Sequence, residues 1–306
     1  MKKRFYILVV LISGLLGVGS IEAREVINLN QGWRFLLGDG AYGVPDVDDS
    51  GWRVLDVPHD WSIEGKYDKR NPSGPQGGFM PCGTGWYRLR FEAPASTKGN
   101  RVFVRFDGVY MKSQVWINGR MVGEYPNGYN SFEYDITPFV RQDTVNVLAV
   151  RVDNSLQPGS RWYTGSGIYR DVNLIVTSQM HFTDGSTFIT TPEVSTERAK
   201  IAMRYEVINH NYPEPRLWSD KTPYLYKLVT TISYDGKEAD RIETPVGIRD
   251  IRFSAERGME VNGEQVKIKG ICVHQNVGCF GVAVPLGVWR ERLETLKAMG
   301  CNAVRV

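Results

Sequence analysis

Six of the eight tryptophans of this 306-residue chain lie before residue 163, where they could form a site for a flat apolar ligand face. An indole ring buries a large apolar area and keeps one N–H donor, so it stacks well on the C–H faces of a pyranose ring. Tryptophan also fills cores, and we expect that of Trp33, Trp86 and Trp116. Trp61 and Trp162 lie in stretches rich in Gly and Pro, so they are the better candidates to face a sugar.

The segments around these tryptophans have the pattern of an antiparallel β-sandwich. Over residues 24–178, apolar and polar side chains alternate in short runs that are separated by glycine turns. The strongest hairpin signal is Asn118-Gly119, which follows the strand-like run that ends at Ile117. The segment from Asp60 to Gly85 has no periodicity, and a loop of that length is usually functional or disordered.

A second β region covers residues 179–255 and contains about five predicted strands. An immunoglobulin-like sandwich normally has about seven strands in ~100 residues, so this region is predicted to be a shortened sandwich.

The last segment, residues 256–306, changes to an α/β pattern. An apolar, β-branched run at 266–273 predicts a buried strand, and the spacing of Trp289, Leu293 and Leu296 predicts a helix over 287–299. A second strand is predicted to start at Ala303. Strand, helix and strand form a parallel βαβ unit, which has no independent core, so we expect a truncated α/β domain.

The first 23 residues have the pattern of a secretory signal peptide. Three basic residues precede an apolar stretch over 5–18, and small residues follow it. We therefore expect an exported protein, periplasmic or secreted. The stretch is short and interrupted by glycine, which disfavours a membrane span, and an uncleaved N-terminal anchor is the alternative.

Net charge excludes a strongly polyanionic partner. The chain has 37 Lys and Arg against 34 Asp and Glu, for a formal charge of +3. Loss of residues 1–23 removes Lys2, Lys3, Arg4 and Glu22, which leaves +1. Neither nucleic acid nor a membrane surface is therefore expected as a partner.

The four cysteines form no C-x-x-C pair, so no zinc site is predicted. Cys272 and Cys279 could pair across a loop, but small buried thiols are the favoured interpretation for Cys82, Cys272, Cys279 and Cys301.

Several strings resemble glycoside hydrolase family 2, most closely the exported β-galactosidases of Bacteroides-like bacteria. The resemblance covers Val26 to Val306. The strings that carry it stand in order along the chain: Val57-Pro58-His59-Asp60-Trp61, Gly85-Trp86-Tyr87-Arg88, Val115-Trp116-Ile117-Asn118-Gly119, Trp162 to Val172, and Val246-Gly247-Ile248-Arg249.

The resemblance implies a mainly β fold: a jelly-roll-like sugar-binding sandwich over 24–178, a short immunoglobulin-like sandwich over 179–255, and the first βαβ unit of a truncated (β/α)8 barrel over 256–306. It also implies a retaining mechanism with two carboxyl groups about 5–5.5 Å apart. In the family both glutamates lie beyond the second barrel strand. No catalytic residue is therefore expected in this chain, which would be inactive alone.

The resemblance places His274, Gln275 and Asn276 after the first barrel strand, at the end that faces the substrate. It places Arg161 and Trp162 in a loop that reaches toward the barrel mouth, with Trp61 as a further candidate for substrate binding. His59 and Asp60 are interpreted as structural. No metal ligand and no cofactor is expected here, although the complete enzyme could hold a divalent or monovalent metal ion.

The expected partner is a carbohydrate, a β-galactoside or an oligosaccharide, and a homo-oligomer of the complete enzyme stays open. Two other functions also stay open. One is a non-catalytic carbohydrate-binding fragment, and the other is a β-glucuronidase of the same family. The abrupt end agrees with a partial record, an artefact or a pseudogene remnant.

Overall fold

The computed structural model describes residues 5–12, 24–179, 181–183, 185, 188–203, 206–208, 214–234 and 237–306. They form two compact units. The sandwich unit consists of residues 25–177, 274–294 and 306, and the second unit holds the rest.

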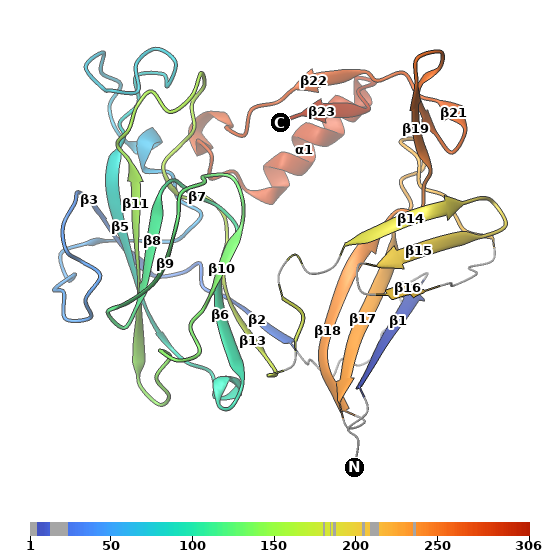
Figure 1. The fold of residues 1–306 in the computed structure, drawn as a ribbon. Coiled ribbons are helices and arrows are strands. Elements are labelled where there is room, and N and C mark those ends of the chain that lie inside the picture. Colours follow the sequence, from blue (N-terminus) through green and yellow to red (C-terminus); the bar gives the residue numbers. More distant parts are fainter. Residues whose placement is uncertain are drawn as a thin grey trace. The chain divides into compact units, whose positions relative to one another are not determined.

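The sandwich unit is built from two main β-sheets (Figure 1). The first sheet has the strand order β4 (Arg53–Leu55), β3 (Trp33–Leu37), β5 (Gly83–Glu92), β11 (Val145–Asn154), β8 (Ser113–Ile117) and β9 (Arg120–Tyr125). The second has the order β10 (Phe132–Asp135), β6 (Arg101–Phe106), β13 (Val172–Thr177) and β2 (Arg24–Asn28). Short pieces complete the unit: β7 (Val109–Tyr110), β12 (Gly167–Ile168), and the 3₁₀ turns η1 (Trp61–Glu64) and η2 (Ala95–Thr97).

The core lies between the two sheets, because the inward side chains of both belong to one buried cluster. Trp33, Tyr87 and Ile117 represent the first sheet, and Val104 and Leu174 the second. The alternation read from the sequence therefore predicted the strands correctly.

The Asn118-Gly119 hairpin is confirmed. β8 and β9 pair antiparallel on either side of it, and both turn residues have positive φ, 49° and 83°. Asn and Gly tolerate this conformation, which a two-residue hairpin of type I′ requires.

The second unit contains several small sheets. One joins β17 (Tyr226–Tyr234) to β18 (Lys237–Val246) and to β1 (Phe5–Ile12). Others consist of β14 (Ile189–Val194), β15 (Ala199–Met203) and β16 (Glu206–Ile208), and of β19 (Ile251–Ser254), β20 (Gly258–Val261) and β21 (Glu264–Gln265). The predicted signal peptide includes β1 and stays a prediction.

The βαβ unit is confirmed. β22 (Gly270–Cys272) and β23 (Ala303–Arg305) pair in parallel, and α1 (Leu286–Ala298) connects them; the 3₁₀ turn η3 (Gly278–Phe280) precedes α1. Gly300 follows the helix with φ 90°, the left-handed conformation that the sequence predicted at its stop.

Two predictions for this segment are wrong. The strand expected over 266–273 is short and mostly exposed, because among the described residues β22 pairs only with β23. Burial of the thiols is wrong as well, since Cys272 and Cys279 are exposed, and all four cysteines are free.

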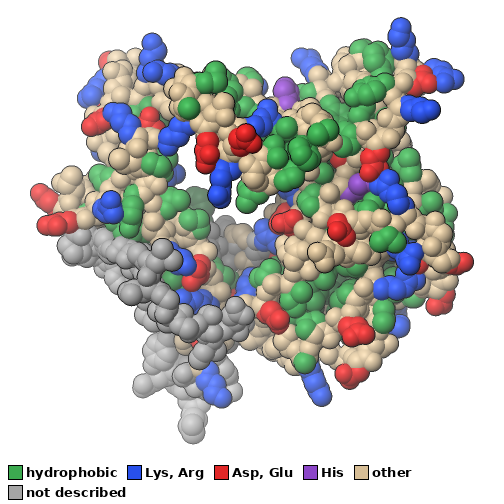
Figure 2. Space-filling view, turned by 180° about the vertical axis from the view of Figure 1, so that it is seen from behind, with side chains coloured by type: hydrophobic (Ala, Val, Ile, Leu, Met, Phe, Trp, Pro, Cys, Tyr) green, Lys and Arg blue, Asp and Glu red, His purple; other side chains and the backbone are tan. Residues whose placement is uncertain are grey.

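Charge on the visible surface is mixed. In Figure 2, basic and acidic side chains alternate without a large area of one sign. Within the described residues, no helix is both long and apolar enough to cross a membrane.

A buried ion pair fixes the loop before β4 to β5. The Arg88 side chain is fully buried, and its Nε donates to Asp49 Oδ2 at 2.8 Å. Its other nitrogens donate to the backbone oxygens of Tyr42, Val44 and Pro45. Burial alone would raise the pKa of Asp49, but the hydrogen bonds from Arg90 and Arg88 outweigh burial and hold that pKa below its ordinary value.

We expect Asp49→Asn to reduce the free energy of unfolding at pH 7 by roughly 3–5 kcal/mol, because it leaves Arg88 buried without a counter-charge. A lowered folded-state pKa means that the stabilisation is present above the unfolded value of about 3.9 and is lost as the pH falls below it. Urea unfolding at pH 7 and at pH 3 should show that the free energy of unfolding decreases less on acidification in the variant than in the native chain.

The matched control is Asp68→Asn, since Asp68 pairs with Arg70, whose side chain is 90% exposed. It should leave the urea midpoint nearly unchanged. Equal effects of the two substitutions would contradict the role given to Asp49.

Candidate functional site

The sequence Val57 to Trp61 folds against the segment that ends the loop of Trp162. His59 N–H donates to Ile168 O at 2.7 Å, and Trp61 N–H donates to Ser166 O at 3.1 Å. Asp60 caps the turn η1, since its carboxylate accepts from Ser62 N–H. Asp is favoured at such a cap because its side chain satisfies a free N–H of the first turn.

The Asp60 carboxylate is buried, with 2% of the residue exposed, and both oxygens are occupied. Oδ1 accepts from the N–H groups of Ser62 at 3.1 Å and Ser166 at 3.0 Å. Oδ2 accepts from the Tyr163 hydroxyl at 2.6 Å and from Val282 N–H at 3.0 Å. Burial raises the pKa of Asp60 despite these four hydrogen bonds, which favour the charged form.

Tyr163 complements this carboxylate. Burial and the neighbouring Asp60 charge both raise the pKa of its phenol, so the hydroxyl stays protonated and acts as a donor.

His59 also has a buried, structural setting. Its Nδ1 lies 2.8 Å from the Tyr87 hydroxyl, and its Nε2 lies 2.8 Å from Arg53 Nη2. Burial is the main reason that the pKa of His59 is lowered, although Glu64 opposes this. The ring is therefore neutral at pH 7 and contributes hydrogen bonds rather than charge.

The structure brings most of the predicted substrate-binding residues together. The rings of Trp162 and His274 lie with centroids 5.6 Å apart, and Trp162 is 40% exposed. Gln275 Nε2 donates to Thr164 O at 3.3 Å, across 111 residues of sequence. Asn276 follows, half-buried, and its backbone oxygen accepts from Arg292.

Tyr129 extends this aromatic surface, a role that the sequence did not indicate. Burial is the main reason that the pKa of its phenol is raised; the neighbouring Tyr110 side chain adds to this and that of Trp162 opposes it. The Tyr129 ring contacts Tyr110 at a centroid distance of 5.4 Å. Tyr129 is 39% exposed. The string Gly128-Tyr129 offered only a weak signal, since a tyrosine in a turn is common.

Arg161 is exposed beside Trp162, and among the described residues it forms no hydrogen bond or ion pair.

Trp61 does not share this surface. Only 2% of it is exposed, and it belongs to the core cluster, where its ring stacks on Phe35 at 5.7 Å. The prediction that Trp61 faces a ligand is therefore corrected: the glycine-rich context suggested a surface position, but the ring fills the end of the sandwich core.

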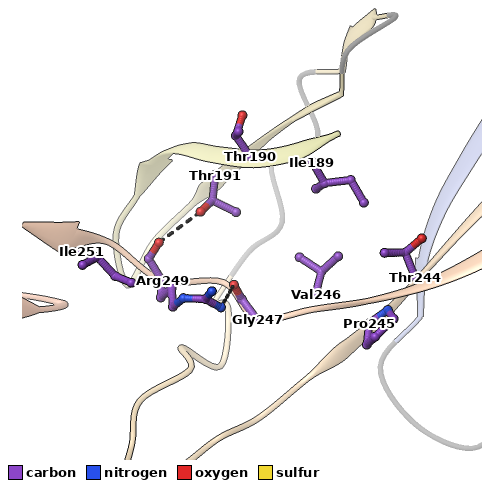
Figure 3. A pocket seen from close by; sticks show the side chains of 9 residues that line it. All are labelled: Ile189, Thr190, Thr191, Thr244, Pro245, Val246, Gly247, Arg249 and Ile251. Carbon is purple, nitrogen blue, oxygen red and sulfur yellow. Dashed lines mark hydrogen bonds between the residues drawn. The ribbon is translucent and has the colours of Figure 1, made fainter. Parts of the chain in front are cut away.

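A separate cavity of about 470 Å³ lies in the second unit, between β14 and the end of β18 (Figure 3). Threonine hydroxyls and apolar side chains line most of it, and Thr191 donates to the backbone oxygen of Arg249. The described residues that line the cavity include no carboxyl group, so they offer neither a general acid nor a nucleophile. The described residues contain no cluster of three or more potential metal ligands.

Comparison with known proteins agrees with this architecture. The family model described as "Glycosyl hydrolases family 2, sugar binding domain" matches residues 26–178, and "Glycosyl hydrolases family 2" matches residues 171–249. The chain is 40% identical to the β-galactosidase BoGH2A of Bacteroides ovatus over 93% of its own length and 38% of that protein.

Two solved structures are similar throughout the chain. A β-glycosidase from Bacteroides vulgatus has a TM-score of 0.87 at 37% identity, with 92% of this chain and 41% of that one covered. A Bacteroides uniformis β-glucuronidase, covalently bound to cyclophellitol-6-carboxylate aziridine, has a TM-score of 0.82 at 28% identity, with 92% and 39% covered.

These matches define the class as glycosidases with a sugar-binding β-sandwich. The chain belongs to glycosyl hydrolases family 2. It spans about two fifths of the length of the relatives described here.

The site geometry predicts a strong effect of Gly165→Ala. A Cβ there would lie 2.1 Å from Val282 Cγ2 and 2.9 Å from Asp60 Oδ2, at φ 73°. We expect a loss of roughly 1–3 kcal/mol from overpacking and strain, measured by urea unfolding.

Gly159→Ala is the control in the same loop, because its Cβ would meet only ordinary contacts at 3.5 Å and beyond. If Gly165→Ala were tolerated as well as Gly159→Ala, the contact between the Asp60 turn and Val282 would not be tight.

Proposed function

We propose that this chain supplies the sugar-binding part of a retaining glycoside hydrolase that acts on β-galactosides. Family membership supports the reaction class, and the 40% identity to a β-galactosidase supports the sugar. The observation that carries the proposal is the contact of Trp162 with His274, because two segments far apart in sequence form one partly exposed aromatic surface.

In this proposal each residue has a binding role. Trp162 stacks on a pyranose face, while His274, Gln275 and Asn276 hydrogen-bond sugar hydroxyls or order the loop that does so. Arg161 lies at the rim. The bond is broken by two glutamates about 5–5.5 Å apart that lie outside this sequence, one as general acid and one as nucleophile.

Asp60 is unsuited to either catalytic task. Its oxygens already accept four hydrogen bonds and the residue is only 2% exposed, so no glycosidic oxygen or anomeric carbon could reach them. We therefore expect the 306-residue chain alone to bind sugar without hydrolysing aryl β-galactosides.

A β-glucuronide is the second candidate substrate. One similar structure is of a β-glucuronidase, and Arg161 is an exposed guanidinium without a carboxylate partner among the described residues. Arg is well suited to hold the carboxylate of a uronic acid through two parallel hydrogen bonds.

Export is part of the proposal. The basic, apolar and small-residue pattern of 1–23 supports cleavage near Arg24. N-terminal sequencing of protein recovered from the periplasm should begin there, whereas a cytoplasmic product that retains Met1 would contradict export.

Trp162→Ala tests the proposed surface. We expect it to weaken binding of a β-galactoside by the 306-residue chain about tenfold, as for loss of a central aromatic contact, measured by isothermal titration. Phe188→Ala is the control, since Phe188 is 64% exposed and belongs to the second unit. Unchanged affinity in the Trp162 variant would overturn the assignment of this surface.

Arg161→Ala separates the two sugars. It should weaken binding of a β-glucuronide strongly and of a β-galactoside little if uronides are the substrate class. Stronger native binding of the galactoside favours the first candidate.

The coding DNA beyond codon 306 completes the test: an open frame with two later glutamates is expected, and an immediate stop codon would favour a non-catalytic carbohydrate-binding protein.

A further inference from the structure

A buried carboxylate usually has a cationic partner, but Asp60 has none among the described residues. Its charge is stabilised by four neutral donors, which fill the acceptor sites of both oxygens. Such an arrangement holds only while every donor stays in place, because losing one leaves a buried charge under-solvated.

Both oxygens bind the loop of Trp162, and Oδ2 alone also binds a distant segment. Oδ1 holds Ser62 and Ser166, which belong to the sandwich itself. Oδ2 holds Tyr163 and Val282, and Val282 lies 222 residues further along the chain. Asp60 therefore joins the sandwich to the segment that follows β22.

The contact between Val282 N–H and Asp60 Oδ2 is tightly packed. Val282 is buried in a small cluster with Tyr110 and Tyr169. A Cβ at Gly281 would lie 2.2 Å from Asp60 Oδ2, so the backbone approaches the carboxylate as closely as a glycine allows.

Both groups on Oδ2 neighbour the aromatic pair. Tyr163 directly follows Trp162 in the chain. Val282 ends a compact turn that starts just after Asn276, and this turn is closed by Val277 N–H donating to Gly281 O at 2.8 Å. A displacement of Oδ2 would therefore move Trp162 through Tyr163 and His274 through the turn that ends at Val282.

We propose that Asp60 is a positioning residue whose Oδ2 fixes the segments of Trp162 and His274 to each other. Its importance for sugar binding rests on the proposed function above, but its effect on the two segments does not. Asp60 touches no substrate and acts only through Tyr163 and Val282.

Asp60→Asn isolates this role in the 306-residue chain. An amide oxygen can replace Oδ1 and keep Ser62 and Ser166, while the new NH₂ faces Val282 N–H, so two donors oppose each other. The Tyr163 hydroxyl can rotate to accept from the NH₂. The substitution should therefore keep the turn cap and lose the Val282 bond.

Hydrogen exchange provides the first readout. We expect the Val282 amide to exchange about tenfold faster in Asp60→Asn, with the Ser166 amide unchanged. Ser62→Ala is the matched control, because it removes the 2.7 Å bond from Ser62 Oγ to Ser166 Oγ and leaves Asp60 intact. Native exchange at Val282, or equal acceleration at Val282 and Ser166, would overturn the proposal.

The second readout is the indole N–H resonance of Trp162, identified by its absence in Trp162→Phe. It should shift in Asp60→Asn and stay in place in Ser62→Ala. An unshifted resonance would overturn the positioning role even if Val282 exchanged faster.

Affinity for a β-galactoside separates the two proposals. A loss in both Trp162→Ala and Asp60→Asn supports both. A loss in Trp162→Ala alone overturns the positioning role for binding and leaves the proposed function intact. Unchanged affinity in both variants, together with altered exchange and a shifted resonance, overturns the proposed function while the positioning of the two segments stands.

Discussion

A carboxylate buried without a counter-ion is the constraint on which the candidate site depends. Asp60 can remain charged in the sandwich only if its two oxygens collect enough donors, and those donors come from η1, from the loop of Trp162 and from the segment before α1. The requirement to solvate one charge therefore gathers three segments at one place. An apolar residue at this position would pack, but it would not specify which backbone groups must meet there.

Asp49 and Asp60 show two solutions to the same problem. Asp49 is balanced by Arg88 and Arg90, and its pKa is lowered; Asp60 has dipoles alone, and its pKa is raised. The first arrangement fixes an edge of the sheet, where a strong charge pair tolerates small shifts. The second is directional, because N–H and O–H donors weaken steeply when they are misaligned. Directionality suits a position that must hold two loops in a defined register.

The sequence predicted what local rules decide. The strands of the sandwich, the Asn118-Gly119 turn and the helix that stops before Gly300 follow from alternation, turn chemistry and helical spacing. It could not predict that Arg88, an apparently outward residue on an alternating strand, is fully buried, or that Trp61 is core. The burial of Arg88 and Trp61 depends on which side chains are covered by the loop before β4 and by the end of the sandwich. No local sequence pattern contains that information. The hydrogen bond from Val282 N–H to Asp60 likewise cannot be predicted from a local sequence pattern, since 222 residues separate the partners.

Under the proposed function, the sandwich unit binds the sugar and two glutamates outside this sequence break the bond, and this division of tasks follows from chemistry. Breaking a glycosidic bond needs carboxyl groups that are accessible and free to exchange a proton or attack carbon. The sandwich unit uses its best-placed carboxylate, Asp60, in the opposite way, with every lone pair occupied and the residue closed to solvent. What it exposes instead is Trp162, Tyr129 and His274, to which the proposed function gives a binding role without a reaction. Such a surface raises substrate affinity and fixes orientation, and its effect on rate comes through placement of the sugar relative to the reacting groups.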